Sequence, residues 1–277
     1  MTPESGGAPR RLDIADARLR RDRIAALALV AAVALLAWAY TVHQARLMDA
    51  MDAKMWREMN MSMNDTKPSW AALDALLVFA MWTTMMAAMM VPGTAPMIAA
   101  FAQINRRRRA RGAPHVPTAI FLGGYLLVWA GFSVLATALQ WALQAMGLLT
   151  TMGESGSHYL SAALFLAAGL YQFSPLKQRC LAFCRSPDGF ILSEWRDGGL
   201  GAVVMGVRRG LFCLGCCAAL MALLFAVAVM DLRWVAALAA LVTAEKLLPG
   251  AHAWRIGIGF ALLAIGVGFA AAGWRAA

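Results

Sequence analysis

The chain has 277 residues, a net charge of +10, and 61% apolar against only 14% charged residues. Together with a mean hydropathy of +0.62, these values exclude an ordinary soluble globular domain and indicate an integral membrane protein. The basic residues gather beside apolar stretches, so the charge indicates membrane topology and argues against nucleic-acid binding.

Apolar stretches near the length that crosses a hydrocarbon core of ~30 Å recur along the chain, the fourth and sixth being short. We therefore predict an all-α fold: a polytopic membrane helix bundle of about seven transmembrane helices. A basic arm, residues 1–23, precedes a single transmembrane domain over residues 24–277. The predicted spans are residues 24–42, 70–92, 118–147, 159–173, 206–230, 234–248 and 255–273.

Lysine and arginine are unevenly distributed among the segments that join these spans. Six arginines precede the first span, the run RRRRAR at residues 106–111 follows the second, and four basic residues follow the fourth. Because basic loops remain on the cytoplasmic side of a membrane, we predict a cytoplasmic N-terminus and an external C-terminus.

The segment after the first span is rich in methionine. We predict that residues 43–69 form an external loop in which Met59, Met61 and Met63, a Met-x-Met-x-Met run, capture Cu(I). Thioethers are soft ligands that suit this ion. The alternative is a short amphipathic helix lying on the membrane, because Met48, Met51, Met55 and Met59 also follow helical spacing.

The second span contains the sequence MWTTMMAAMM, which is followed by VPGTAPM. Wound as a helix at ~100° per residue, it places five methionines on one half of the circumference. Such a row is a candidate path of Cu(I) ligands, and the alternative is methionine that only fills a helix interface. Two prolines predict a kink before the segment continues to residue 103. The candidate ligands are Met81, Met85, Met86, Met89, Met90 and Met97.

The five cysteines lie toward the predicted cytoplasmic side. Cys180 and Cys184 are four residues apart, and Cys213, Cys216 and Cys217 form the motif CLGCC. Helical spacing places each group on one face, so a thiolate metal site is predicted. One alternative is that the cysteines are small buried residues, and another is that Cys-x-x-Cys performs redox exchange.

Two charged residues lie near the inner end of the sixth predicted span. Glu245 is a candidate for proton or ion coupling, because an intramembrane carboxylate is costly and faces a partner or cavity. Alternatively, Glu245 has a structural role, in which its carboxylate pairs with an arginine such as Arg208 or Arg209 and fixes helix packing. Lys246 is adjacent, points ~100° away, and is expected to reach the cytoplasmic surface.

Four of these motifs occur in order between about residues 81 and 249: MWTTMMAAMMVPGTAPM, YQFSPLKQRCLAFCRSP, CLGCC with AALMALLF, and AEKLLPG. In this region the chain resembles a bacterial family of uncharacterised predicted metal-binding integral membrane proteins. The resemblance implies metal binding at the Met and Cys positions and a multi-pass location in the bacterial inner (cytoplasmic) membrane. The Met-x-x-x-Met spacing also resembles the ligand chemistry of copper-uptake transporters of the Ctr type, whose short trimeric architecture differs.

We therefore expect a membrane protein that binds or translocates Cu(I), with zinc as the alternative metal. A membrane thiol oxidoreductase using CLGCC and a non-catalytic subunit that assembles a partner metalloprotein are the competing functions. The sequence contains no phosphate loop, nucleophilic triad or paired catalytic carboxylates, which argues against an enzyme. The expected partners are the lipid bilayer and either a metallochaperone or a membrane metalloenzyme; the oligomeric state is left open.

Overall fold

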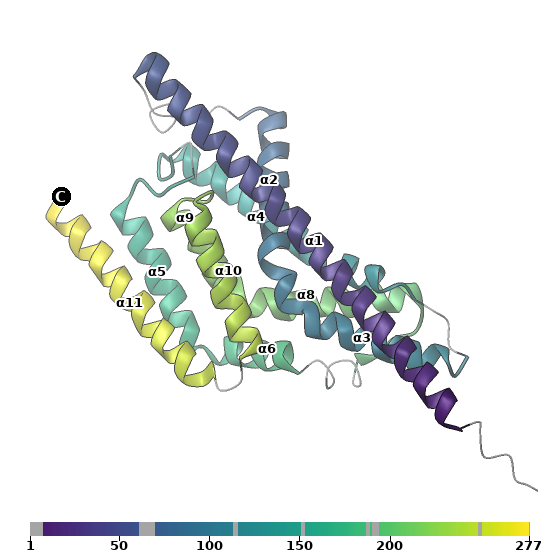
Figure 1. The fold of residues 1–277 in the computed structure, drawn as a ribbon. Coiled ribbons are helices and arrows are strands. Elements are labelled where there is room, and N and C mark those ends of the chain that lie inside the picture. Colours follow the sequence, from purple (N-terminus) through teal and green to yellow (C-terminus); the bar gives the residue numbers. More distant parts are fainter. Residues whose placement is uncertain are drawn as a thin grey trace, which may run out of the picture.

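The computed structural model describes residues 8–60, 70–112, 116–150, 153–186, 189, 194–248 and 251–276. Over these residues the chain is a bundle of helices without a named strand, so the predicted all-α fold is confirmed (Figure 1). The elements are α1 (Ala8–Met59), α2 (Ala72–Met90), η2 (Pro92–Thr94), α3 (Ala95–Arg109), α4 (Thr118–Ala145), α5 (His158–Phe173), α6 (Pro175–Arg185), α8 (Gly198–Ala222), α9 (Leu224–Val227), α10 (Leu232–Leu247) and α11 (Ala251–Ala276).

Within the described part of the chain, five segments are long and apolar enough to cross a membrane: Arg23–Glu58, Ala72–Met90, Thr118–Ala145, Gly198–Val227 and Ala253–Arg275. A sixth span results if α5 and α6, which meet at a bend of 66°, count as one. Each of the seven predicted spans coincides with a helix, but α5 and α10 have only 16 residues each. Since a helix needs about 20 residues to cross a bilayer, the number seven stays a prediction.

The largest difference from the predicted elements is in α1. The structure shows no loop after residue 42, because the helix continues without interruption to Met59. The helical alternative for this methionine-rich segment therefore fits residues 43–59, although here the helix extends the first span. Met61 and Met63 lie outside the described residues, as does the side chain of Met59.

The predicted kink after the second span is confirmed. Pro92 has no N–H to continue the hydrogen-bond ladder, so α2 ends and the 3₁₀ turn η2 leads into α3. In this turn the backbone N–H of Thr94 donates to the carbonyl of Val91 at 3.0 Å. A fully α-helical path would have placed that bond on Met90, whose carbonyl is left for another donor.

Helices α4 and α8 pack against each other through glycine. A Cβ atom on Gly206 would collide with the carbonyl oxygen of Phe121, and one on Gly124 would collide with that of Val203. Small residues allow such close backbone approach between membrane helices. To one side, α5 and α11 run side by side, and α10 packs near α2 and α6 (Figure 1). The C-terminal ends of α2, α6 and α10 thereby meet the interior turns of α8.

Candidate metal centre

Three thiols converge on α8. The Sγ atoms of Cys213, Cys216 and Cys217 all lie within 4.8 Å of one another, and each residue is at most 2% exposed. The i, i+3, i+4 spacing places them on one helix face, as the sequence predicted. The Sγ atoms of Cys213 and Cys217 are 4.0 Å apart. Three sulfur atoms this close to one another are suitably spaced to hold one metal ion.

A fourth thiol comes from α6. The Sγ atom of Cys184 is 3.8 Å from that of Cys216. Arg209 on α8 fixes this approach, because its guanidinium donates to the carbonyls of Phe183 and Cys184, both at 2.6 Å. Cationic groups stabilise helix C-termini by such bonds. Cys180 lies one turn earlier and packs against α8 at Gly215, where a Cβ atom would be 2.7 Å from its sulfur.

A thioether completes the group. The Sδ atom of Met90, the last residue of α2, is 3.7 Å from the Sγ atom of Cys217. The Met90 carbonyl freed by the proline break accepts a hydrogen bond from the hydroxyl of Tyr125 at 3.3 Å. That hydroxyl is also 3.1 Å from the Sγ atom of Cys213. We refer to Cys184, Cys213, Cys216, Cys217 and Met90 as the sulfur cluster.

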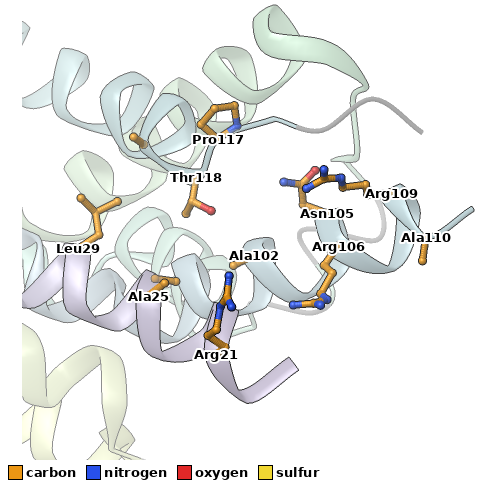
Figure 2. Close-up of a pocket in the computed structure, with 12 residues that line it drawn as sticks. Arg21, Ala25, Leu29, Ala102, Asn105, Arg106, Arg109, Ala110, Pro117 and Thr118 are labelled. Carbon is orange, nitrogen blue, oxygen red and sulfur yellow. The ribbon is translucent and has the colours of Figure 1, made fainter. Parts of the chain in front are cut away.

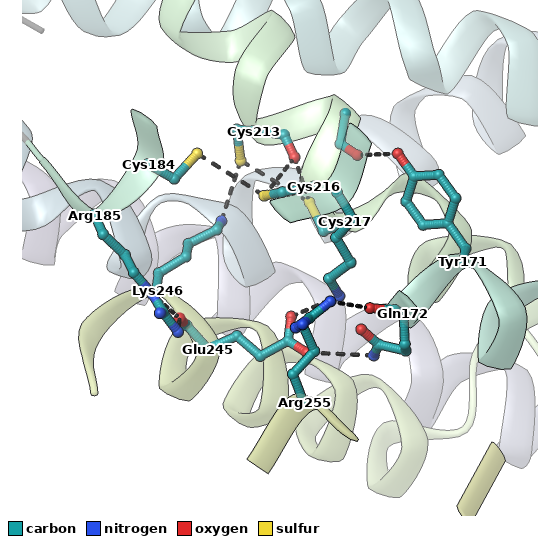
Figure 3. A network of polar contacts seen from close by, with 12 residues as sticks. Tyr171, Gln172, Cys184, Arg185, Cys213, Cys216, Cys217, Glu245, Lys246 and Arg255 are labelled. Carbon is teal, nitrogen blue, oxygen red and sulfur yellow. Dashed lines mark hydrogen bonds and ion pairs between the residues drawn. The ribbon is translucent and has the colours of Figure 1, made fainter. Parts of the chain in front are cut away.

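The side chain of Lys246 extends from α10 into the sulfur cluster. Figure 3 shows it pointing toward the cysteine thiols. Its Nζ atom is 3.1 Å from the Sγ atom of Cys213 and 3.6 Å from the Sδ atom of Met90. The residue is 5% exposed, so the expectation that it reaches the membrane surface is wrong. Gly93 in η2 makes room for its stem, since a Cβ atom there would lie 3.1 Å from the Lys246 Cδ atom.

Glu245 points away from the thiols into a second polar group (Figure 3). Its carboxylate forms a 2.8 Å ion pair with Lys177 and accepts a 3.2 Å hydrogen bond from Gln172. The expected arginine partners are wrong: Arg208 pairs with Glu194, and Arg209 donates to α6. As the sequence analysis allowed, Glu245 and Lys246 have different partners. The Glu245 carbonyl accepts from the Nε atom of Arg185 at 2.8 Å, which fastens α6 to α10.

The buried charges around the sulfur cluster are unbalanced. Among the described residues near it, the buried anion Glu245 is paired with Lys177, which leaves the buried cations Lys246 and Arg209 beside the cysteines. Burying uncompensated charge is costly, so an excess of cations favours an anionic occupant nearby. Thiolates supply negative charge, and Cu(I) held by two or three thiolates remains anionic. The residues present therefore fit a thiolate-bound monovalent ion.

The other predicted sulfur ligands lie in the same interior but outside the sulfur cluster. Met85, Met86, Met89 and Met97 are each at most 1% exposed and belong to one continuous core with the cysteines. Met81 lies at the middle of α2 and lines a cavity of about 190 Å³. Met48 of α1 and Met230, from the segment between α9 and α10, also line this cavity.

Sequence reasoning missed several residues around the site. On sequence alone, Lys177 indicates only topology and Arg209 is only an alternative partner of Glu245, while nothing singles out Tyr125 or Met230. For Lys177 and Arg209 a signal existed, because each is a charge next to a cysteine motif. Tyr125 and Met230 become recognisable only when separate helices are brought together.

Comparison with known proteins gives one informative match. The model of a family described as "PpoB2: Copper chaperone" matches residues 79–269, more than half of the chain. This region contains the four motifs that carried the resemblance and the entire sulfur cluster. No curated protein and no solved structure matches the chain.

Proposed function

Because the chain belongs to the PpoB2 copper chaperone family, we propose that it is a membrane copper chaperone that holds Cu(I) at the sulfur cluster. In this function the protein delivers the ion to a partner metalloprotein and catalyses no reaction itself. The proposed location is the bacterial inner membrane, with the basic N-terminal arm in the cytoplasm. The helices that are apolar and long enough to cross a membrane support this placement.

The single observation that carries the proposal is the convergence of sulfur from three helices. Sulfur–sulfur contacts of 3.7–4.0 Å join Cys184 of α6 to Cys216, and join Cys217 to both Cys213 and Met90 of α2. The three thiols of α8 all lie within 4.8 Å of one another, which brings these contacts into one group. Soft thiolate and thioether ligands select Cu(I) over hard cations. Zinc is the alternative, since four thiolates suit a tetrahedral Zn²⁺ site. The mixed thiol and thioether set favours Cu(I).

We propose different roles for the two kinds of sulfur. Cys213, Cys216 and Cys217, with Cys184, hold the ion tightly, and Met90 is the exchangeable ligand beside them. The methionines of α2 then form the route along which Cu(I) moves, because conduction needs weak, exchangeable ligands in series. At ~1.5 Å per residue, nine residues separate Met81 from Met90 by roughly 13 Å. Cys180 and Met97 are additional sulfur positions beside this route.

The cavity lined by Met48, Met81 and Met230 is the proposed point where the route reaches the external side. Three thioethers from three segments surround it, together with the amides of Gln44 and Gln140. Met59, Met61 and Met63 remain the proposed capture site beyond it. The capture site, the cavity and the methionines of α2 all offer thioether ligands, so Cu(I) would keep the same type of ligand along the whole route.

A thiol oxidoreductase fits the geometry less well. Its proposed exchanging pairs are Cys213–Cys216 and Cys180–Cys184, whereas the contacts observed are Cys184–Cys216 and Cys213–Cys217. All five cysteines are free and buried, and thiol–disulfide exchange requires access for the attacking thiolate. Burial suits a metal site that excludes water and oxidant.

Elemental analysis of protein purified anaerobically in detergent and loaded with Cu(I) tests the proposal. We expect at least one tightly bound Cu(I) per chain, measured by competition with a Cu(I) chelator. The variant Cys213→Ser/Cys216→Ser/Cys217→Ser should lose it, whereas the control Cys180→Ser should retain it. Unchanged affinity in the triple variant would refute the site. Metal-free wild-type protein with a reversible disulfide between Cys213 and Cys216 would favour the oxidoreductase.

A further inference from the structure

A large cleft lies between α1, α3 and α4, away from the sulfur cluster (Figure 2). It has a volume of about 940 Å³ and is much larger than the methionine-lined cavity. Arg21 of α1 and Arg106 and Arg109 of α3 line one part of it. Another part of the cleft is lined by the apolar side chains of Ala25, Ala26, Leu29 and Ala102. The cleft is therefore cationic at one end and apolar along its length.

From this distribution we infer that the cleft binds an anionic phospholipid, with the phosphate against the three arginines and an acyl chain along the alanines and Leu29. Guanidinium groups match phosphate oxygens through paired, charge-assisted hydrogen bonds. The residues that line the cleft in the described part of the chain include no aspartate or glutamate. Asn105 lies beside Arg109 and its side-chain amide donates to the carbonyl of Val116, while Thr118 lies between Leu29 and Asn105 (Figure 2).

The position of the cleft favours a membrane lipid over a soluble anion. Its arginines are continuous with the run at residues 106–111 and with the N-terminal arm, which place this end at the proposed cytoplasmic face. Basic pockets between helices on that side bind anionic headgroups. The apolar wall would contribute nothing to a free phosphate, whereas an acyl chain buries it.

A lipid bound in this cleft would contact helices from separate parts of the chain. The α1 residues of the cleft, Arg21 to Leu29, precede the region matched by the family model, while α3 and α4 lie within it. A lipid with its headgroup on α1 and α3 would fasten the long first helix to the copper-binding bundle. This inference is independent of the proposed copper function.

Native mass spectrometry of protein released from nanodiscs tests the site. The nanodiscs contain phosphatidylglycerol and phosphatidylcholine in equal amounts with identical acyl chains. The variant Arg21→Gln/Arg106→Gln/Arg109→Gln removes the cationic end. The matched control Arg23→Gln/Arg107→Gln/Arg111→Gln removes the same charge from neighbouring positions that do not line the cleft.

We expect the wild type to retain one phosphatidylglycerol with a preference of about tenfold over phosphatidylcholine. The cleft variant should lose this preference and the control should keep it. If the cleft variant does not fold, Arg106→Gln/Arg109→Gln is the substitute, and it should lower the preference in the same direction. Equal loss in variant and control would show general surface attraction and overturn the site. Glycerol phosphate that displaces the lipid at similar concentration would show a free-anion site and also overturn it.

Discussion

The ammonium group of Lys246 lies 3.1 Å from the Cys213 sulfur, in a part of the bundle from which water is excluded. The contact joins α10 to α8 and places a fixed positive charge beside the thiols. At such a distance in a low-dielectric interior, the charge stabilises a thiolate and any anionic complex formed on it. Copper binding should therefore depend on a residue that is not itself a ligand.

Replacing Lys246 with methionine tests this dependence. The variant Lys246→Met keeps most of the side-chain volume and removes the counter-ion of the thiolate complex. We expect Cu(I) affinity to fall by roughly 10–100-fold, the range found when groups that support metal ligands are lost. Chelator competition measures the affinity, and X-ray absorption should still show sulfur coordination. The surface variant Lys54→Met, on α1, should bind Cu(I) like the wild type; an equally tight Lys246→Met would contradict the charge argument.

We expect Glu245 to be a structural residue. The stability lost when it is replaced should be regained when its partner Lys177 is replaced as well. The variant Glu245→Gln leaves the Lys177 ammonium buried without its carboxylate, which should lower the free energy of unfolding by about 3–5 kcal/mol. Denaturation in detergent measures this loss. The double variant Lys177→Met/Glu245→Gln should regain most of it. If Glu245→Gln is as stable as the wild type but changes the pH dependence of copper delivery, the proton-coupling role is the correct one.

The contact between α4 and α8 predicts a sharp difference between two glycines. Gly206→Ala should destabilise the protein by about 1–3 kcal/mol, because its new methyl group collides with the α4 backbone. Cu(I) affinity should fall as well, since Tyr125 on α4 loses its position beside Cys213. Gly131→Ala, at an exposed position of α4, meets nothing within 4 Å and should change stability by no more than about 1 kcal/mol. Equal thermal stability of the two variants would contradict the packing.

The methionine-lined cavity should control the rate of copper transfer and leave affinity unchanged. The variant Met48→Leu/Met81→Leu/Met230→Leu keeps the volume but removes three thioethers. We expect Cu(I) exchange with a chelator, followed by stopped-flow, to slow by about tenfold, because the weak ligands of the route are lost. The exposed methionines Met51 and Met146 supply the control Met51→Leu/Met146→Leu, which should exchange at the wild-type rate. A wild-type rate in the cavity variant would remove the cavity from the route.

Local periodicity predicted much of this structure. Apolar runs located a helix at each of the seven predicted spans, Pro92 predicted the break after α2, and the spacing within CLGCC placed three thiols on one face. Each of these features depends on residues within a few turns of one another. The sequence therefore contained the shape of each element and the part of the site that lies on α8.

The rest depends on how separate helices meet. Nothing local indicates that Cys184 contacts Cys216, or that Met90 rather than another methionine reaches the thiols. Lys246 illustrates the same limit, because a lysine near a span end ordinarily extends to the surface. Here the small Gly93 in the turn after α2 leaves space for its stem. The loop predicted after residue 42 failed for another reason: polar residues at helical spacing continue a helix as readily as they form a loop.

The uninterrupted α1 also sets a length scale. From residue 42 to Met59 the helix advances roughly 25 Å at 1.5 Å per residue, and in Figure 1 this end of α1 extends past the rest of the bundle. With residue 42 at the lipid boundary, even a tilt of about 40° leaves roughly 20 Å of projection. The C-terminal part of α1 then forms a rigid helical projection, and a docking partner would contact its end well beyond the lipid headgroups. Deleting whole turns from this projection would bring the docking point of the partner closer to the membrane surface without altering the copper site.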